Sequence, residues 1–84
     1  MKLVWSEQAW DDYLYWQETD KRMVKKTNEL IKEIRRTPFE GKGKPEPLRH
    51  NLAGFWSRRI TAEHRLVYSM TDEALLIAAG RYHY

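Results

Sequence analysis

The hydrophobic pattern changes along this chain from a helical period in the first half to strand-like runs in the second. Three β-branched or aromatic runs, each bounded by turn residues, predict strands over residues 55–60, 64–70 and 74–84. The connections at residues 61–63 and 71–73 are short enough to be hairpin loops. We expect the third strand to continue to the last residue, because no polar tail follows its final aromatic side chain.

The first half begins with a short apolar run, residues 2–5, that predicts another strand. Ser6 is then expected to cap a helix whose acidic early turns suit the helix dipole. The apolar stripe of this helix follows helical spacing. It consists of Trp10, Tyr13, Leu14 and Gln17, and Trp16 widens it.

A second helix is expected to begin after Thr19-Asp20, which breaks and recaps the chain, and to run to about Arg36. Its predicted buried face consists of Met23, Val24, Thr27, Leu30, Ile31 and Ile34. The first helix is acidic and the second is basic, so the pair is expected to form an antiparallel hairpin on the sheet. The outer face, with Lys25 and Lys26, is typical of a solvated surface; contact with an RNA backbone or a ribosome is the alternative.

These elements define the expected fold class, which is α+β: two N-terminal helices packed on a small twisted antiparallel sheet. The loop-like stretch is residues 38–47, which hold all three prolines. No internal repeat or low-complexity tract marks a boundary, so residues 1–84 are expected to form one domain. A chain of 84 residues buries roughly 60–65% of its unfolded surface.

Alternation within the predicted strands places cations on one face of the sheet. The parity expected to cover the core carries Trp56, Ile60, Leu66, Tyr68 and Met70. The other parity carries Arg59 and Arg65, which lie opposite each other if the hairpin loop has three residues. Like charges directly opposite one another destabilise a sheet. Either the two side chains splay into solvent, or they share an anion such as a phosphate.

The net charge of +3 is unevenly placed. Residues 1–40 hold equal numbers of acidic and basic residues, so the whole excess falls in residues 41–84, together with all three histidines. We expect that half to attract an anion. The chain has no cysteine, which excludes disulfides and thiolate metal sites. The apolar run at residues 3–5 is too short for a signal peptide or a membrane span, so a cytoplasmic location is expected.

Glu46 stands between Pro45 and Pro47 in the loop-like stretch. The prolines restrict the backbone, so the Glu46 carboxylate is expected to point in a set direction beside Arg49 and His50. A glutamate in a basic loop is ordinarily a surface charge. One whose backbone is restricted beside two basic side chains is a candidate for chemistry.

The basic half offers a carboxylate, histidines and several arginines, and it lacks an evident nucleophile. Neither Ser57 nor Ser69 stands at a nucleophile elbow, and three scattered histidines make a weak metal site. RNA supplies its own nucleophile in the 2′-hydroxyl group. Its cleavage needs a base for that proton, an acid for the departing 5′-oxygen and cations for the phosphorane.

Four motifs resemble the YoeB family of the RelE/ParE toxin superfamily. They lie at residues 45–52 (PEPLRHNL), 54–60 (GFWSRRI), 63–68 (EHRLVY) and 81–84 (RYHY), and the similarity extends over essentially the whole chain. The resemblance implies a RelE-like, microbial-RNase-like fold and a ribosome-dependent messenger-RNA endonuclease without cofactor or metal. It also implies four partners: a YefM-type antitoxin, the 70S ribosome, messenger RNA and a second copy of the chain.

The resemblance also assigns roles to single residues. Glu46 would be the general base and His83 the general acid, while Arg59 and Arg65 would hold the phosphate. The other residues of the implied site are Tyr84, which would position the substrate, and the substrate-binding residues Arg49, Lys44, Arg81 and Tyr82. The family pattern has lysine where this chain has Arg49. The substitution keeps the charge and argues against proton transfer at that position.

Two other functions stay open on the sequence. Some toxins of this superfamily inhibit DNA gyrase on the same scaffold, and a non-catalytic RNA-binding module would also explain the cations. The pair Glu46 and His83 discriminates among the three, because neither alternative needs an acid and a base.

Overall fold

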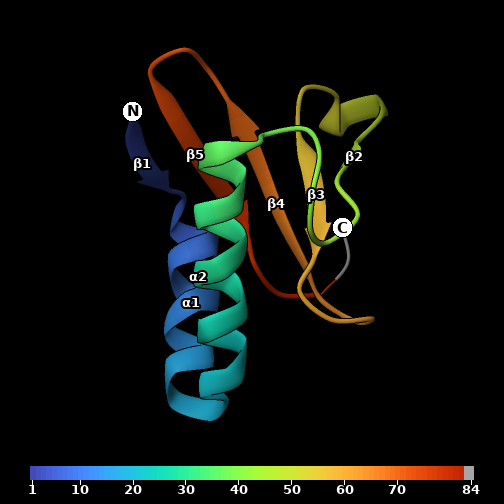
Figure 1. Ribbon diagram of the computed structural model, residues 1–84. Coiled ribbons are helices and arrows are strands. Elements are labelled where there is room, and N and C mark those ends of the chain that lie inside the picture. The colour runs from blue at the N-terminus through green and yellow to red at the C-terminus, as the bar shows by residue number, and fades with distance from the viewer. Residues whose placement is uncertain (83–84) are drawn as a thin grey trace.

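The structure, a computed structural model, describes residues 1–82, and its elements are labelled in Figure 1. In chain order they are β1 (Lys2–Trp5), α1 (Glu7–Thr19), α2 (Lys21–Arg36), β2 (Glu46–Pro47), the 3₁₀ turn η1 (His50–Leu52), β3 (Trp56–Arg59), β4 (Arg65–Met70) and β5 (Ala74–Ala79). The strands form one sheet in the order β1-β5-β4-β3-β2. The predicted α+β class, with two N-terminal helices packed on a small sheet, is confirmed.

The sheet is mixed, whereas the sequence predicted an antiparallel one. β1 runs parallel to β5, and the other three pairings are antiparallel. A parallel pair cannot be closed by a tight hairpin, and here both helices lie between the two strands in the chain. The predicted loop also contains the two-residue strand β2 at the sheet edge, where Pro47 needs no ladder partner for a backbone N–H.

Local capping groups begin both helices at the predicted places. Ser6 Oγ accepts a hydrogen bond from Ala9 N at 3.0 Å and donates one to Ala78 O at 2.7 Å, which also ties α1 to β5. Asp20 ends α1 by donating its N–H to Trp16 O, and its side chain then caps α2 by accepting from Arg22 N. The two helices run side by side along one face of the sheet (Figure 1). The predicted helical hairpin is therefore confirmed.

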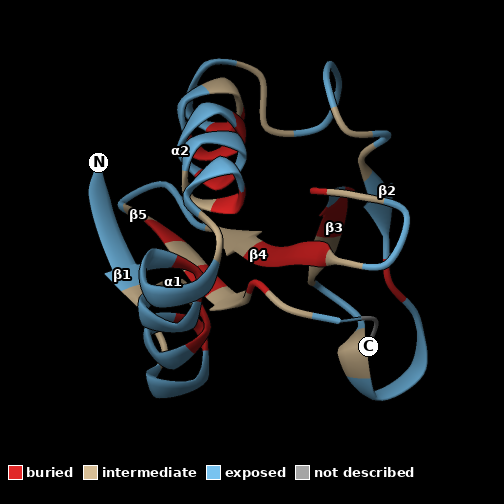
Figure 2. Ribbon diagram, turned by 90° about the horizontal axis from the view of Figure 1, so that it is seen from below, coloured by how far each residue is buried: buried red, intermediate tan, exposed pale blue. Residues whose placement is uncertain are grey.

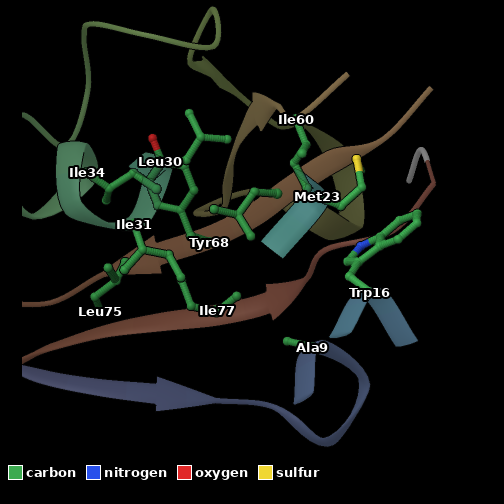
Figure 3. Packing of buried hydrophobic residues seen from close by; sticks show 11 residues of the cluster. Ala9, Trp16, Met23, Leu30, Ile31, Ile34, Ile60, Tyr68, Leu75 and Ile77 are labelled. Carbon is green, nitrogen blue, oxygen red and sulfur yellow. The ribbon is translucent and has the colours of Figure 1, made fainter. Parts of the chain in front are cut away.

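The core lies between α2 and the central strands. The predicted buried face of α2 is confirmed for Met23, Thr27, Leu30, Ile31 and Ile34, while Val24 is partly buried at its edge. Figure 3 shows this helix face directed at Tyr68 of β4 and at Leu75 and Ile77 of β5. Each such aliphatic side chain contributes roughly 1.5–3 kcal/mol when fully buried. Burial is most continuous in β3 and β4 (Figure 2), the two strands that carry the arginine pair.

Of the predicted apolar stripe of α1, Trp16 is buried, but the stripe is wrong about which other residues face the core. The buried residues are Ala9, Asp12 and Trp16, while Trp10 and Leu14 are 46% and 38% exposed. Trp10 instead stacks on Tyr13 outside the core, with 5.9 Å between ring centroids. Aromatic neighbours on the surface thus produce a helical period that does not mark the buried face.

The last strand is also shorter than predicted, because β5 ends at Ala79. Gly80 turns away toward α1, and Tyr82 has a φ of 63°, in the left-handed region. His83 and Tyr84, which the prediction placed in this strand, lie outside the described residues. Within residues 1–82, no helix combines the length and the apolar character needed to cross a membrane.

Candidate functional site

Strand register brings Glu46 and the two strand arginines to one face of the sheet. Arg59 lies directly opposite Arg65, as predicted. Glu46 lies opposite Ser57, which is two residues before Arg59 on β3. Directly opposed residues, and residues two apart on a strand, project to the same face. One carboxylate and two guanidinium groups therefore share the face that the helices leave uncovered.

The spacing suits a group the size of a phosphodiester. Neighbouring strands lie about 4.8 Å apart and a strand rises about 3.3 Å per residue. From this register, the Cα atom of Glu46 lies about 8 Å from that of Arg59 and about 12 Å from that of Arg65. Long arginine side chains can bridge such gaps to one bound group.

Arg65 is the unusual member of the pair. It is only 8% exposed, and its Nε and Nη1 atoms have no hydrogen-bond partner among the described residues. Arg59, opposite it, is exposed. A desolvated cation with unused donors is costly unless an acceptor is supplied. The arrangement therefore favours a site that is completed by an anion.

The ion pairs of the helix surface do not fill that role. The ion pairs within residues 1–82 join Asp20 to Arg22 and Glu33 to Arg36, both on or beside α2. Hydrogen bonds from these arginines hold the pKa of each of the two carboxyl groups below its ordinary value. These pairs lie at the helix surface, and neither of them involves a cation of the sheet.

Arg58 is a structural residue that the sequence analysis missed. It is fully buried and faces the core side of β3, between Trp56 and Ile60. Its guanidinium group donates to Tyr68 Oη at 3.1 Å and to three backbone carbonyls of the segment that follows α2. These are Lys42 O at 3.0 Å, Glu40 O at 2.8 Å and Thr37 O. The alternation that assigned Trp56 and Ile60 to the core also applied to Arg58, so the signal was present.

Tyr68 completes this anchor from the neighbouring strand. Its hydroxyl group donates to Pro38 O at 2.7 Å while it accepts from Arg58. Burial raises the pKa of Tyr68, and the hydrogen bond from Arg58 opposes that rise in part. A buried guanidinium and a phenol together hold the connection between α2 and β2 against the sheet.

Gly43 brings the same connection close to the arginine pair. Its carbonyl accepts from Arg59 N at 2.6 Å. Its φ is 85°, and a Cβ atom there would lie 3.1 Å from Arg58 Cβ and from Arg59 O. Only glycine satisfies both the conformation and the close approach. This contact places Glu46, three residues later, beside β3.

Arg49 and Lys44, two of the predicted substrate contacts, line separate surface hollows. Glu46 and Arg49 line a depression of about 580 Å³ that residues 46–52 form. Lys44 and Arg59 line a second depression, of about 380 Å³, together with Lys26 and Lys42 on its other walls. Arg49 thus shares a hollow with Glu46, and Lys44 shares one with Arg59.

The described end of the chain lies beside the start of β4. Tyr82 O accepts from Arg65 N at 3.1 Å, and Tyr82 N donates to His64 Nδ1 at 2.8 Å. Arg81 turns toward α1, with its guanidinium carbon 3.6 Å from the centroid of the Tyr15 ring. His83 and Tyr84 follow directly in sequence and lie outside the described residues. Within residues 1–82, no group of three or more His, Cys, Asp or Glu side chains could hold a metal ion.

Comparison with known proteins decides the family. The model of the family described as "YoeB-like toxin of bacterial type II toxin-antitoxin system" matches residues 5–84. The chain belongs to this family. Toxin YoeB of Escherichia coli (strain K12) is 82% identical over 84 residues, with both chains covered completely. The family resemblance seen in the sequence motifs is therefore confirmed over the whole chain.

Solved structures of YoeB proteins agree with the fold. A YoeB dimer from Staphylococcus aureus matches with a TM-score of 0.94 and 53% identity, covering 100% of this chain and 98% of that one. A heterotetrameric YoeB-YefM toxin-antitoxin complex from the same organism matches with a TM-score of 0.92, the same identity and the same coverage. The arrangement of helices and sheet is thus that of the YoeB toxins.

Proposed function

We propose that this YoeB-like toxin is a ribosome-dependent endoribonuclease that cleaves translated messenger RNA in the ribosomal A site and so inhibits translation. The observation that carries the proposal is Arg65, a nearly buried guanidinium with unused donors, directly opposite Arg59 and on the same sheet face as Glu46. A phosphodiester supplies the missing acceptors and offsets the repulsion between the two cations. Membership of a toxin family supports the same conclusion.

The proposed chemistry uses the 2′-hydroxyl group of the RNA as nucleophile. Glu46 takes its proton, the 2′-oxygen attacks the phosphorus, and His83 protonates the 5′-oxygen as the bond to phosphorus breaks. The products are a 2′,3′-cyclic phosphate and a free 5′-hydroxyl group. Arg59 and Arg65 stabilise the negative charge that grows on the phosphorane. Every proton is accounted for without a metal or a cofactor.

The roles of Glu46 and His83 have separate support. Glu46 lies on the sheet face that carries the arginines, held there by its pairing with β3. His83 is assigned by motif and by the chain itself, because it is joined to Tyr82, whose carbonyl accepts from Arg65 N. We assign Tyr84 to positioning of the substrate and Arg49 and Lys44 to the flanking RNA backbone.

The partners are inferred from the relatives. Because the S. aureus YoeB structures include a dimer and a complex with YefM, we infer a YefM-type antitoxin and a homodimer for this toxin as well. The ribosome would be contacted by the cationic outer face of α2, where Lys25 and Lys26 are exposed. These contacts would bring the sheet face to the message.

Single-turnover cleavage of a message bound to 70S ribosomes tests the proposal. Glu46→Gln and His83→Gln should each lower the rate by about 10²–10⁴-fold, the usual share of one acid–base group. Ribosome binding should stay near that of the wild type. Loss of ribosome binding in either variant would mean that a docking residue had been taken for a catalytic one. An intact message together with inhibited DNA supercoiling by gyrase would overturn the proposal.

A further inference from the structure

Two side chains of α1 hold Gly80, where the chain leaves β5. Asp12 Oδ2 accepts from Gly80 N at 2.9 Å, and Trp16 Nε1 donates to Gly80 O at 2.8 Å. Asp12 and Trp16 are four residues apart and so lie on one face of the helix. Both are buried, with Asp12 3% exposed. Both backbone polar groups of Gly80, its N–H and its C=O, are thus hydrogen-bonded to side chains of α1.

The next residues are held in the same way. Arg81 lies over the ring of Tyr15, and Tyr82 N donates to His64 Nδ1. The His64 ring also packs edge-on against Trp16, with 4.8 Å between centroids. We call Asp12, Trp16 and His64 the C-terminal clasp. Together with Tyr15, it restrains residues 80, 81 and 82 in succession.

Core packing alone does not explain this arrangement. A carboxyl group at position 12 occupies a helix face that otherwise packs against the core through Ala9 and Trp16. Within residues 1–82, Asp12 has no ion-pair partner; its other contact is Gln8 Nε2 at 2.8 Å. The clasp also keeps Tyr82 at a positive φ, a conformation that costs a non-glycine residue energy and persists where the surroundings impose it. Such local strain is typical of functional segments.

We propose that Asp12 and His64 are positioning residues, which hold the backbone of Gly80 and Tyr82 and so support the acid step that the proposed function assigns to His83. The inference rests on the proposed ribonuclease function. For Nδ1 to accept from Tyr82, His64 carries its ring proton on Nε2, so its role is that of an acceptor in the clasp. Neither residue contacts the RNA in this scheme.

RNA with sulfur in place of the departing 5′-oxygen tests the proposal. A thiolate leaves without a proton, so this substrate relieves a defect in the general acid and leaves a defect in the base. The variants are Asp12→Ala and His64→Phe, which remove the acceptors; the phenyl ring keeps the contact with Trp16. The matched controls are Asp12→Asn and His64→Asn, which keep an acceptor oxygen near the original atom.

Misplacing the acid should slow cleavage of ordinary RNA at saturation by about 10–100-fold in Asp12→Ala and His64→Phe, with ribosome binding unchanged. On the sulfur RNA, Asp12→Ala and His64→Phe should cleave less than about threefold more slowly than the wild type, and His83→Gln should recover in the same way. Glu46→Gln should remain slow on this substrate, because its defect lies in the base. Both asparagine variants should approach the wild-type rate. Equal losses on the two substrates would overturn the proposal, because they would indicate a general structural defect.

Amide hydrogen exchange in the free toxin provides a readout that does not depend on cleavage. Exchange at Gly80 N and Tyr82 N should quicken at least about tenfold when the acceptor is removed, while amides of α2 keep their protection. Unchanged exchange at both amides would refute the clasp even if activity fell. If Asp12→Ala fails to fold, the His64→Phe comparison decides. The proposed function would be contradicted if the wild type left RNA intact, or if the sulfur RNA did not restore cleavage by His83→Gln. In that case the hydrogen-exchange result alone would test the clasp.

Discussion

Replacing Arg65 by methionine is expected to stabilise the folded toxin while it removes most of the cleavage activity. Arg65 is 8% exposed, and two of its nitrogen atoms have no hydrogen-bond partner among residues 1–82. Methionine is similar in length and flexible enough to fill the same space without donors. The substitution therefore removes a desolvated cation and leaves the surrounding packing nearly filled.

The size of the effect follows from the unused donors. An unsatisfied buried polar group costs about 1–3 kcal/mol. Replacing buried charges by well-packed apolar groups is often neutral or stabilising by about 1–4 kcal/mol. The change also removes the like charge opposite Arg59. We expect the free energy of unfolding to rise by about 1–3 kcal/mol. Loss of one donor to the phosphorane should lower the cleavage rate by about 10²–10³-fold.

Urea unfolding followed by tryptophan fluorescence measures the first quantity, and single-turnover cleavage on ribosomes measures the second. Arg59→Met is the matched control because Arg59 is exposed. Its stability should stay within about 0.5 kcal/mol of the wild type although its rate falls. Because the two arginines act on one phosphate, the double variant should lose less than the product of the single losses. Inorganic phosphate should stabilise the wild type more than Arg65→Met.

Two results would refute the shared phosphate site. If Arg65→Met lowers the free energy of unfolding by more than about 1 kcal/mol, with an unchanged urea m-value, the guanidinium group contributes to the fold. If the losses of the two single variants multiply in the double variant, and if they appear in RNA binding but not in the cleavage step, the two arginines contact separate parts of the RNA backbone. Either result would remove the basis for a shared phosphate site.

Three further predictions concern Tyr68, the outer face of α2 and the antitoxin. Tyr68→Phe should cost about 1–3 kcal/mol at pH 7, because Pro38 O loses its donor. Burial raises the pKa of Tyr68 above its ordinary 10.0, so the stabilisation it provides is complete below about pH 10 and is lost as the pH rises through the folded-state pKa. Urea unfolding at pH 7–11 should show that loss in the wild type alone, and an equal loss in both proteins would contradict it. Removing the charge of Lys25, which does not line the depression beside Arg59, should weaken ribosome binding in a salt-dependent way and leave saturated single-turnover cleavage unchanged; slower cleavage at saturation would place it in the site. The antitoxin should cover the cationic sheet face and residues 81–84 with an acidic and apolar segment that is disordered when free, and a complex structure with that face open would refute this.

Much of the fold could be predicted because its signals are local. The 3.6-residue period of α2 marked its buried face, and Ser6 and Asp20 marked the helix starts through bonds to residues two or three positions away. Alternation on either side of a three-residue loop also placed Arg59 opposite Arg65. In each case the relevant contacts lie close in sequence, so short patterns carry the information.

Tertiary structure decided the features that depend on distant contacts. The parallel pairing of β1 with β5 joins the two ends of the described chain, and nothing in either strand's pattern encodes direction. The last strand stops at Ala79 because Asp12, 68 residues earlier, captures Gly80. Arg58 was available to alternation and was still missed, since a buried cation becomes favourable only when the carbonyls of a distant segment surround it. The arginine pair could be predicted from the sequence by itself. The burial of Arg65, however, exists only in the folded protein, and it is this burial that leaves two of its nitrogen atoms without acceptors among residues 1–82 and so favours a bound anion.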